Sequence, residues 1–165
     1  MTNIEQWNQL HAICLDTIRS AIQGISPKIL KKKAGDSLEP VGEILNHVIG
    51  AEIYWLKEVK ITPIFSEVDE SGWKESAFLD EFIKIEKQYA DILRKKGLDK
   101  DILFGLGRAC QHALYHYANI VTARRMIKPD WTEPVSLRWE RAVDYISDLL
   151  IADRPISIRS DIKNG

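Results

Sequence analysis

The chain has 165 residues, of which 45% are hydrophobic and 28% are charged, and its formal net charge is −1. This length suits a single domain, and the balance of residue types is that of a folded globular protein rather than a disordered chain. A net charge near zero excludes a global electrostatic attraction to nucleic acid, so we expect no nucleic-acid partner. No apolar run approaches the ~18 residues of a membrane-spanning helix, so we expect no membrane partner either.

The start of the chain and its two cysteines favour a cytoplasmic protein. The first residues carry no basic segment followed by an apolar stretch, so we expect no secretory signal. Cys14 and Cys110 form no CxxC pair and no closely spaced framework of the kind found in disulfide-rich domains. Because both lie in apolar segments with helical spacing, we expect free thiols that pack as small core residues.

Apolar residues at intervals of three and four dominate the first half of the chain and predict long helices. The first helix is expected from about residue 4 to Gly24, a residue type that suits a helix end. A loop follows over 25–39. Pro40 suits the first turn of a second helix, because a proline there loses no hydrogen bond. This second helix is expected to continue to about Lys60.

The second half of the chain begins with an acidic loop, expected over 64–72. A third helix is expected over 73–96, closed by Gly97. Its apolar stripe consists of Phe78, Phe82, Ile85, Tyr89 and Ile92. A fourth helix is expected to begin between residues 103 and 108 and to end at 127, before a Lys-Pro pair. A shorter fifth helix is expected over about 135–151.

These elements predict an all-α protein built as a four-helix bundle. Four helices of about twenty residues, joined by connections of moderate length, are typical of such bundles. We expect a single domain over 1–165, with the bundle at about 4–127 and a C-terminal extension at about 131–165. The tail from Asp153 onward contains an alternating stretch that could form an extended arm.

His112 and His116 form the most informative motif. They lie four residues apart, which puts both imidazoles on one face of a helix about one turn apart. One helix can offer two ligands to one metal ion in this way. No glutamate stands between them in the HExxH manner, which excludes the helical metalloprotease motif. Spacing alone leaves other interpretations open, namely two histidines on a solvated face or core histidines paired with carboxylates.

A third histidine, His47, lies on the expected second helix between the apolar residues Ile44 and Val48, at or near the buried side. An imidazole directed into a core must find partners for both ring nitrogens. Three converging histidines could share a metal ion, each giving one nitrogen to the ion and the other to an outer acceptor. His11 has no such partner, and we expect it to be an ordinary residue of the first helix.

Two stretches of the chain resemble the DinB-like superfamily. In residues 40–56, a histidine is followed five residues later by a glutamate and then by aromatic residues, as in the second-helix signature of that family: His47, Glu52, Tyr54 and Trp55. Residues 112–120 resemble its second metal motif, and the whole resemblance spans about residues 7–127. Many members carry Arg-Gly-Gln after the last histidine, whereas this chain has Tyr-Ala-Asn, so that Asn119 keeps an amide at the glutamine position.

The resemblance implies a four-helix bundle in up-down-down-up order and a metal site formed by His47, His112 and His116. It also implies a divalent metal ion, a small-molecule substrate and a homodimer. Because all three donors are imidazole nitrogens, we expect zinc or nickel rather than magnesium or calcium. Characterised relatives include bacillithiol-dependent and mycothiol-dependent S-transferases, a thiol-dependent isomerase and metal-dependent hydrolases.

Three protein ligands leave a coordination position open, which is typical of catalytic metal sites. We therefore expect a metal-dependent thiol S-transferase or hydrolase that acts on a small electrophilic substrate, with a low-molecular-weight thiol as cosubstrate. The alternative is a non-catalytic, metal-stabilised bundle that serves in dimerisation, binding or a stress response. A bundle that has lost its metal is a third interpretation.

Four further residues are candidates for the surroundings of the metal. Glu43 lies about one turn before the histidine of the second helix, and Asn119 about one turn after the histidine pair, so both could hold ligand rings from outside. Tyr54 and Trp55 could line a substrate pocket. Ordinary packing within the bundle is the alternative interpretation for each of them.

Helical pitch directs two other polar residues away from the metal ligands. Glu52 lies about 140° around the helix from His47, so we expect it to pair elsewhere. Cys110 lies about 200° from His112, which argues against a fourth, thiolate ligand.

Overall fold

The computed structural model describes residues 3–132, and its long elements within that range are all helices. They are α1 (Asn3–Ile22), α3 (Val41–Glu58), α4 (Glu75–Lys96) and α5 (Lys100–Ile127). The expected all-α class is therefore confirmed for the described residues, among which there is no strand. The helix expected over 135–151 and the tail from Asp153 lie outside them. No helix in the described range has the length and apolarity needed to cross a bilayer.

Two short elements interrupt segments that the sequence predicts as loops. The loop expected over 25–39 contains α2 (Pro27–Lys31), where the Ser26 side chain accepts a hydrogen bond from the backbone N–H of Ile29. The loop expected over 64–72 contains a single 3-10 turn, η1 (Glu70–Gly72). Elements this short are missed because one turn carries no measurable apolar periodicity.

α5 begins earlier than the sequence predicts. The Asp99 carboxylate accepts hydrogen bonds from the backbone N–H groups of Asp101 and Ile102, which starts the helix at Lys100. Immediately before this cap, α4 ends as expected, because Gly97 adopts a φ of 70° that other residues rarely adopt.

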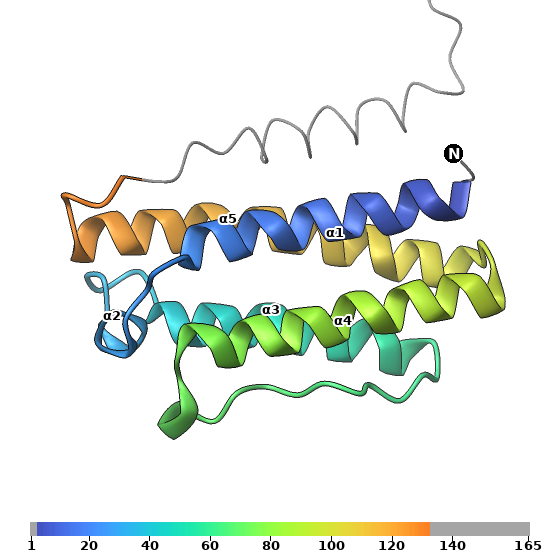
Figure 1. Ribbon diagram of the computed structural model, residues 1–165, viewed down its shortest axis with the longest axis horizontal. Helices are drawn as coiled ribbons and strands as arrows, with labels where there is room; N and C mark the ends of the chain where they lie inside the picture. Colours follow the sequence, from blue (N-terminus) through green and yellow to red (C-terminus); the bar gives the residue numbers. More distant parts are fainter. Residues whose placement is uncertain (1–2, 133–165) are drawn as a thin grey trace, which may run out of the picture.

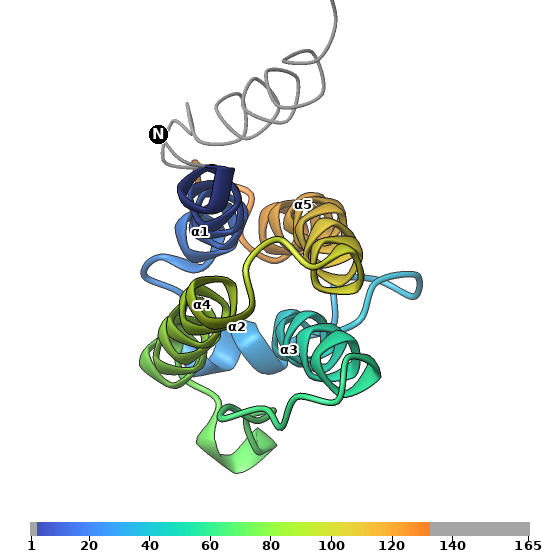
Figure 2. The ribbon, with the colours of Figure 1, turned by 90° about the vertical axis from the view of Figure 1, so that its right-hand side faces the viewer.

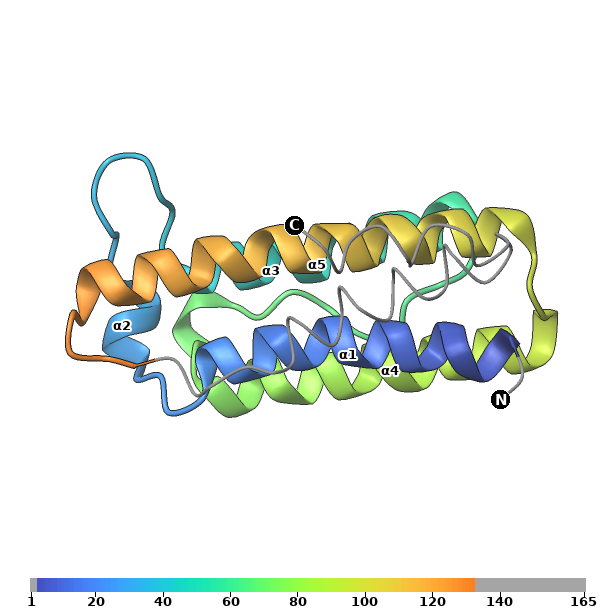
Figure 3. The same cartoon turned by 90° about the horizontal axis from the view of Figure 1, so that it is seen from above.

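The four long helices lie side by side along one axis (Figure 1). Seen end on, they form a ring in the order α1, α5, α3 and α4 (Figure 2), and each helix packs against its two neighbours in that ring. The connection between α3 and α4 runs back along the outside of the helices, so α3 and α4 begin at the same end of the molecule. The loop between α2 and α3 projects outward at that end (Figure 3).

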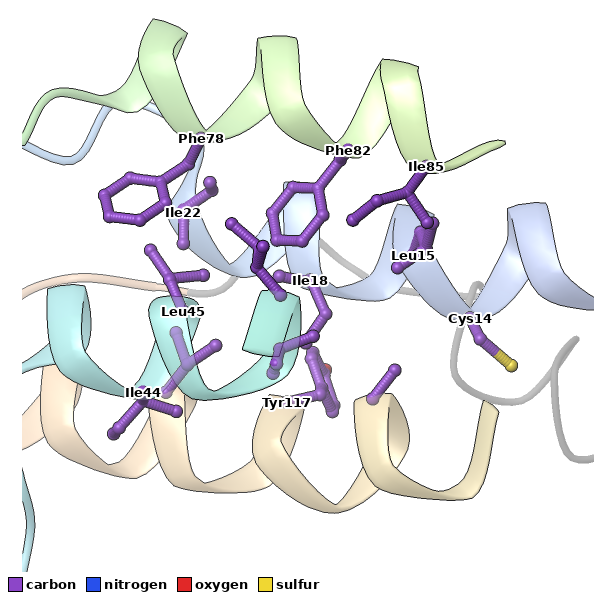
Figure 4. Packing of buried hydrophobic residues seen from close by; sticks show 14 of the residues in the cluster. Cys14, Leu15, Ile18, Ile22, Ile44, Leu45, Phe78, Phe82, Ile85 and Tyr117 are labelled. Atoms are coloured by element: carbon purple, nitrogen blue, oxygen red, sulfur yellow. The ribbon is translucent and has the colours of Figure 1, made fainter. Parts of the chain in front are cut away.

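The core fills the space enclosed by the four helices (Figure 4). The stripe predicted for α4 is buried throughout: Phe78, Phe82, Ile85, Tyr89 and Ile92. These side chains meet Leu15 and Ile18 from α1 and Leu45 from α3, all of which are fully buried. Burial of this apolar surface is the main term that holds the helices together.

The connection between α3 and α4 is fixed to α3 at two points. The Asn46 side chain donates to the carbonyl of Val68 at 2.9 Å and accepts from its N–H at 2.8 Å. The Trp73 indole lies against α3 at Gly42, where an added Cβ would be 2.3 Å from a ring carbon. The close approach of this ring therefore requires glycine at position 42. Together with the hydrogen bonds of Asn46, this contact holds the first part of α3 in place.

We expect Gly42→Ala to lower the free energy of unfolding by about 1–3 kcal/mol, because the new methyl group overlaps the Trp73 ring. Gly107→Ala is the matched control. It lies inside α5 with no atom within 4 Å of an added Cβ, and we expect it to raise stability by up to ~1 kcal/mol through helix propensity. Urea unfolding followed by circular dichroism measures both. Equal free energies of unfolding for Gly42→Ala and wild type would contradict the close contact of the Trp73 ring with α3 at Gly42.

Candidate metal centre

Three of the four histidines, His47, His112 and His116, lie together at the surface where α3 packs on α5. The Nε2 atom of His112 is 3.1 Å from Nε2 of His47 and 3.1 Å from Nε2 of His116. The donor atoms that the three rings offer all lie within 4.8 Å of one another. Among the described residues, this is the only group of three or more potential ligands that converges in this way. The three histidines could therefore hold a metal ion.

Small residues on α5 allow α3 to come close enough for this contact. Gly105, Ala109 and Ala113 follow one another at intervals of four and are all buried. A Cβ added at Gly105 would lie 3.5 Å from the Cβ of Trp55 on α3, which is ordinary van der Waals contact. Because the distance between packed helices depends on the side chains at the contact, this face of α5 favours a short one.

Two of the three distances between the ring nitrogens, those that involve His112, fit a shared ion. Two nitrogens bound to zinc at about 2.0–2.1 Å with a tetrahedral angle stand roughly 3.3 Å apart, and with a right angle about 2.9 Å. The 3.1 Å separations fall between these values. Hydrogen bonds alone do not account for the arrangement, because Nε2 of His112 has one lone pair or one hydrogen and faces two nitrogens. A shared cation would give each of the three rings a partner.

Burial and mutual proximity favour the neutral forms of His112 and His116. Partial burial lowers the pKa of His112, and the charge on His47 lowers it further. Burial, followed by the charges on His112 and His47, lowers the pKa of His116 to about 4. A neutral imidazole keeps a lone pair on one nitrogen, which is the form that binds a metal ion.

His47 differs from expectation in its burial. The sequence places it at or near the buried side of its helix, whereas the structure exposes its side chain while Ile44 and Val48 beside it are buried. Apolar neighbours in sequence do not fix the direction of one side chain, because consecutive helix positions differ by about 100°. His112 and His116 are partly buried. The candidate centre is therefore open to solvent on the side of His47.

A pocket of about 410 Å³ adjoins His47 and His116. Its other lining residues come from α3, from α5 and from the projecting loop before α3 (Figure 3): Ser37, Leu38, Glu39, Glu43, Ile44 and Asn119. The structure thus brings both predicted outer residues, Glu43 and Asn119, to the pocket beside His47 and His116. Such a volume, lined by both polar and apolar side chains, suits a small organic molecule.

Asn119 also contacts a ligand ring directly, since its amide nitrogen lies 3.4 Å from Nδ1 of His116. When Nε2 of a histidine binds a metal, Nδ1 carries the hydrogen and needs an acceptor. The Asn119 side chain supplies that acceptor when its amide is flipped, so that the oxygen rather than the nitrogen faces the ring. The hydrogen-bond network determines which of the two orientations is correct.

The structure does not bring Tyr54 and Trp55 to the pocket beside the triad. The Tyr54 ring is exposed and packs edge-on against Trp55, with 4.9 Å between the ring centroids. Trp55 lines a different pocket, of about 490 Å³, together with Phe104 and Gly105 at the start of α5. Trp55 follows His47 by eight residues, or about two helical turns, which is too far along the axis to share one small pocket.

A buried pair in the core, Glu52 and His11, was predicted only in part from the sequence. As helical pitch predicts, Glu52 pairs elsewhere. Its partner is His11, with 3.1 Å between Nε2 and Oε1, so His11 is not the ordinary helix residue that we expected. The separation of 41 residues hides this pair from any local pattern.

Cys14 and Cys110 are free and buried as expected, and the neighbouring Cys14 thiol together with burial raises the pKa of Cys110.

Comparison with known proteins found no match among protein-family models, curated proteins or solved structures. The candidate centre therefore rests on the geometry of its own residues.

We expect the protein, produced without a histidine tag, to bind one Zn²⁺ or Ni²⁺ ion per chain. His112→Ala should abolish stoichiometric binding, because His112 is the ring in contact with both others. Gln111→Ala, a change of the exposed neighbour on the same helix, should leave binding unchanged. Elemental analysis and calorimetric titration measure the stoichiometry. The metal site is refuted if wild type takes up no stoichiometric ion or if His112→Ala binds as wild type does.

Proposed function

We propose that this chain is a DinB-like protein that holds one divalent ion, zinc or nickel, with His47, His112 and His116. We further propose that it is a metal-dependent thiol S-transferase or hydrolase acting on a small electrophilic substrate. The observation that carries the proposal is the convergence of three Nε2 atoms beside a pocket of about 410 Å³. An all-imidazole donor set suits zinc or nickel better than the oxygen-seeking magnesium or calcium.

The arrangement of the helices supports the family part of the proposal. We infer the up-down-down-up order that the resemblance implies. The long connection that returns along the outside of the molecule lets α3 and α4 begin at the same end, as this order requires (Figure 1). It also leaves α3 and α5 side by side, so that one histidine from α3 meets the pair on α5.

The residues around the centre support a catalytic rather than a closed structural site. Three imidazoles would leave at least one coordination position of a divalent ion open. A water or thiol bound at that position would have a lowered pKa. The exposed side of His47 gives a substrate access to that position. Glu43 is exposed on the pocket wall, where its carboxylate can accept a proton or hold an ammonium group. Leu38 and Ile44 supply an apolar surface for the electrophile.

The proposed reaction is tested with the metal-loaded protein. We expect conjugation of low-molecular-weight thiols to a chloronitroarene or an epoxide, or hydrolysis of a small amide or ester, at rates above the uncatalysed reaction. Gln111→Ala should match wild type, and His112→Ala should fall to the background rate. Absence of turnover with every thiol and every hydrolysable substrate, in protein that binds one ion per chain, would contradict the enzymatic part. The metal-stabilised, non-catalytic bundle would then be the better description.

A further inference from the structure

The pocket beside the histidine triad has walls of one charge. Among the described residues that line it, Glu39 and Glu43 are the only charged side chains apart from the histidines. Both are exposed, and a glutamate exposed to water is negatively charged at neutral pH. The rest of the lining is apolar or carries neutral polar groups. A molecule in this pocket therefore meets two carboxylates and no lysine or arginine on the wall.

Cations of the protein do not occupy these two carboxylates. None of the ion pairs among residues 3–132 involves Glu39 or Glu43. Arg108 lies on α5 as His116 does, but about 12 Å before it along the helix axis, and it does not line the pocket. A positively charged group of a ligand would therefore find both carboxylates available.

The backbone keeps both carboxylates close to the candidate metal ligands. Glu43 comes one turn before His47 on α3, so the two side chains share a helix face and are separated by roughly 5.4 Å along the axis. Glu39 directly precedes Pro40, and a residue before proline is restricted to extended backbone. A small molecule bound to an ion at the triad can thus reach Glu43 with a substituent only a few atoms long.

The pocket of about 490 Å³ between the same two helices has a different lining. Its charged residues include both signs: Glu58, Lys60, Lys96, Asp99 and Asp101. It also contains no histidine. A wall with negative charge alone is therefore a property of the pocket at the triad and not of every cavity between α3 and α5.

We propose that the pocket beside the triad selects small molecules that carry an ammonium group, and that Glu43 and Glu39 are the residues responsible. The inference rests on the transferase form of the proposed function, in which the ion binds a thiol. The converging imidazoles indicate a ligand site independently of the carboxylates, which determine the preferred charge of the ligand. Two carboxylates, a divalent ion and a thiolate sum to one negative charge, which an ammonium group balances and a further carboxylate increases.

The start of α3 offers a different role for Glu43. This residue lies in the first turn of the helix, where a carboxylate interacts favourably with the helix dipole. A role of that kind affects the stability of the protein and not its choice between ligands. The two roles are therefore separated by a measurement that compares ligands of different charge on the same protein.

The test uses protein loaded with Co²⁺ in place of Zn²⁺, because a thiolate bound to cobalt produces a charge-transfer absorption. Thiocholine carries a quaternary ammonium group that cannot bind the metal, and 3,3-dimethylbutane-1-thiol is its uncharged analogue of the same shape. We expect Glu43→Gln and Glu39→Gln each to weaken thiocholine binding about 3-fold and the double variant about 10-fold, as for ion pairs exposed to water. Binding of the uncharged thiol should not change.

Glu58→Gln is the matched control. It removes the same charge from another exposed position of α3, about 22 Å from Glu43 along the helix and in the lining of the other pocket. The ratio of the two thiol affinities should stay at its wild-type value in this variant. In wild type, the preference for thiocholine should decrease in 1 M salt, where the Debye length is only about 3 Å.

Two results would overturn the inference through the variants: a double variant that keeps the wild-type ratio of affinities, or a Glu58→Gln variant that lowers this ratio as much. A third needs only the wild-type chain and so does not depend on the folding of a variant. If wild type binds the anionic 3-mercaptopropionate more tightly than thiocholine, the pocket does not select for positive charge. Absence of the absorption with every thiol, in protein that holds one Co²⁺, would instead contradict the transferase itself.

Discussion

His47 reaches the pair on α5 because α3 packs closely against that helix, and the candidate centre depends on this contact. The 3.1 Å separation between Nε2 of His47 and Nε2 of His112 requires the two helices to keep a fixed spacing and register along the site. The small residues Gly105, Ala109 and Ala113 permit the spacing. Asn46, held by both backbone groups of Val68, fixes the turn of α3 on which His47 lies. The geometry of this surface site is thus set by the packing of α3 against α5 and against the connection that follows α3.

The candidate centre has an outer side that is open to solvent and an inner side that is buried. On the outside, the exposed His47 and a pocket with carboxylates leave room for a small molecule. On the inside, Nδ1 of His112 is shielded from water and has no hydrogen-bond partner.

Much of this could be predicted from the sequence, and the limit is set by contacts between distant residues. Apolar periodicity predicted the buried stripe of α4, and the spacing of four predicted that His112 and His116 share a face. Local patterns carry no information on a pair 41 residues apart, so the partner of Glu52 was missed. They also fix only roughly the direction of a single side chain, which is why His47 was expected to be more buried. Tyr54 and Trp55 were candidates for lining the substrate pocket, but an aromatic residue in the sequence does not indicate which cavity it lines, and Trp55 lines a different one.

The proposed function depends on the binding of a single ion by three imidazoles of one chain, and X-ray absorption at the zinc edge of the loaded protein measures this coordination. We expect three imidazole nitrogens at about 2.0–2.1 Å, with a fourth light-atom ligand and no sulfur. A sulfur ligand at about 2.3 Å, or fewer than three imidazoles around the ion, would contradict it.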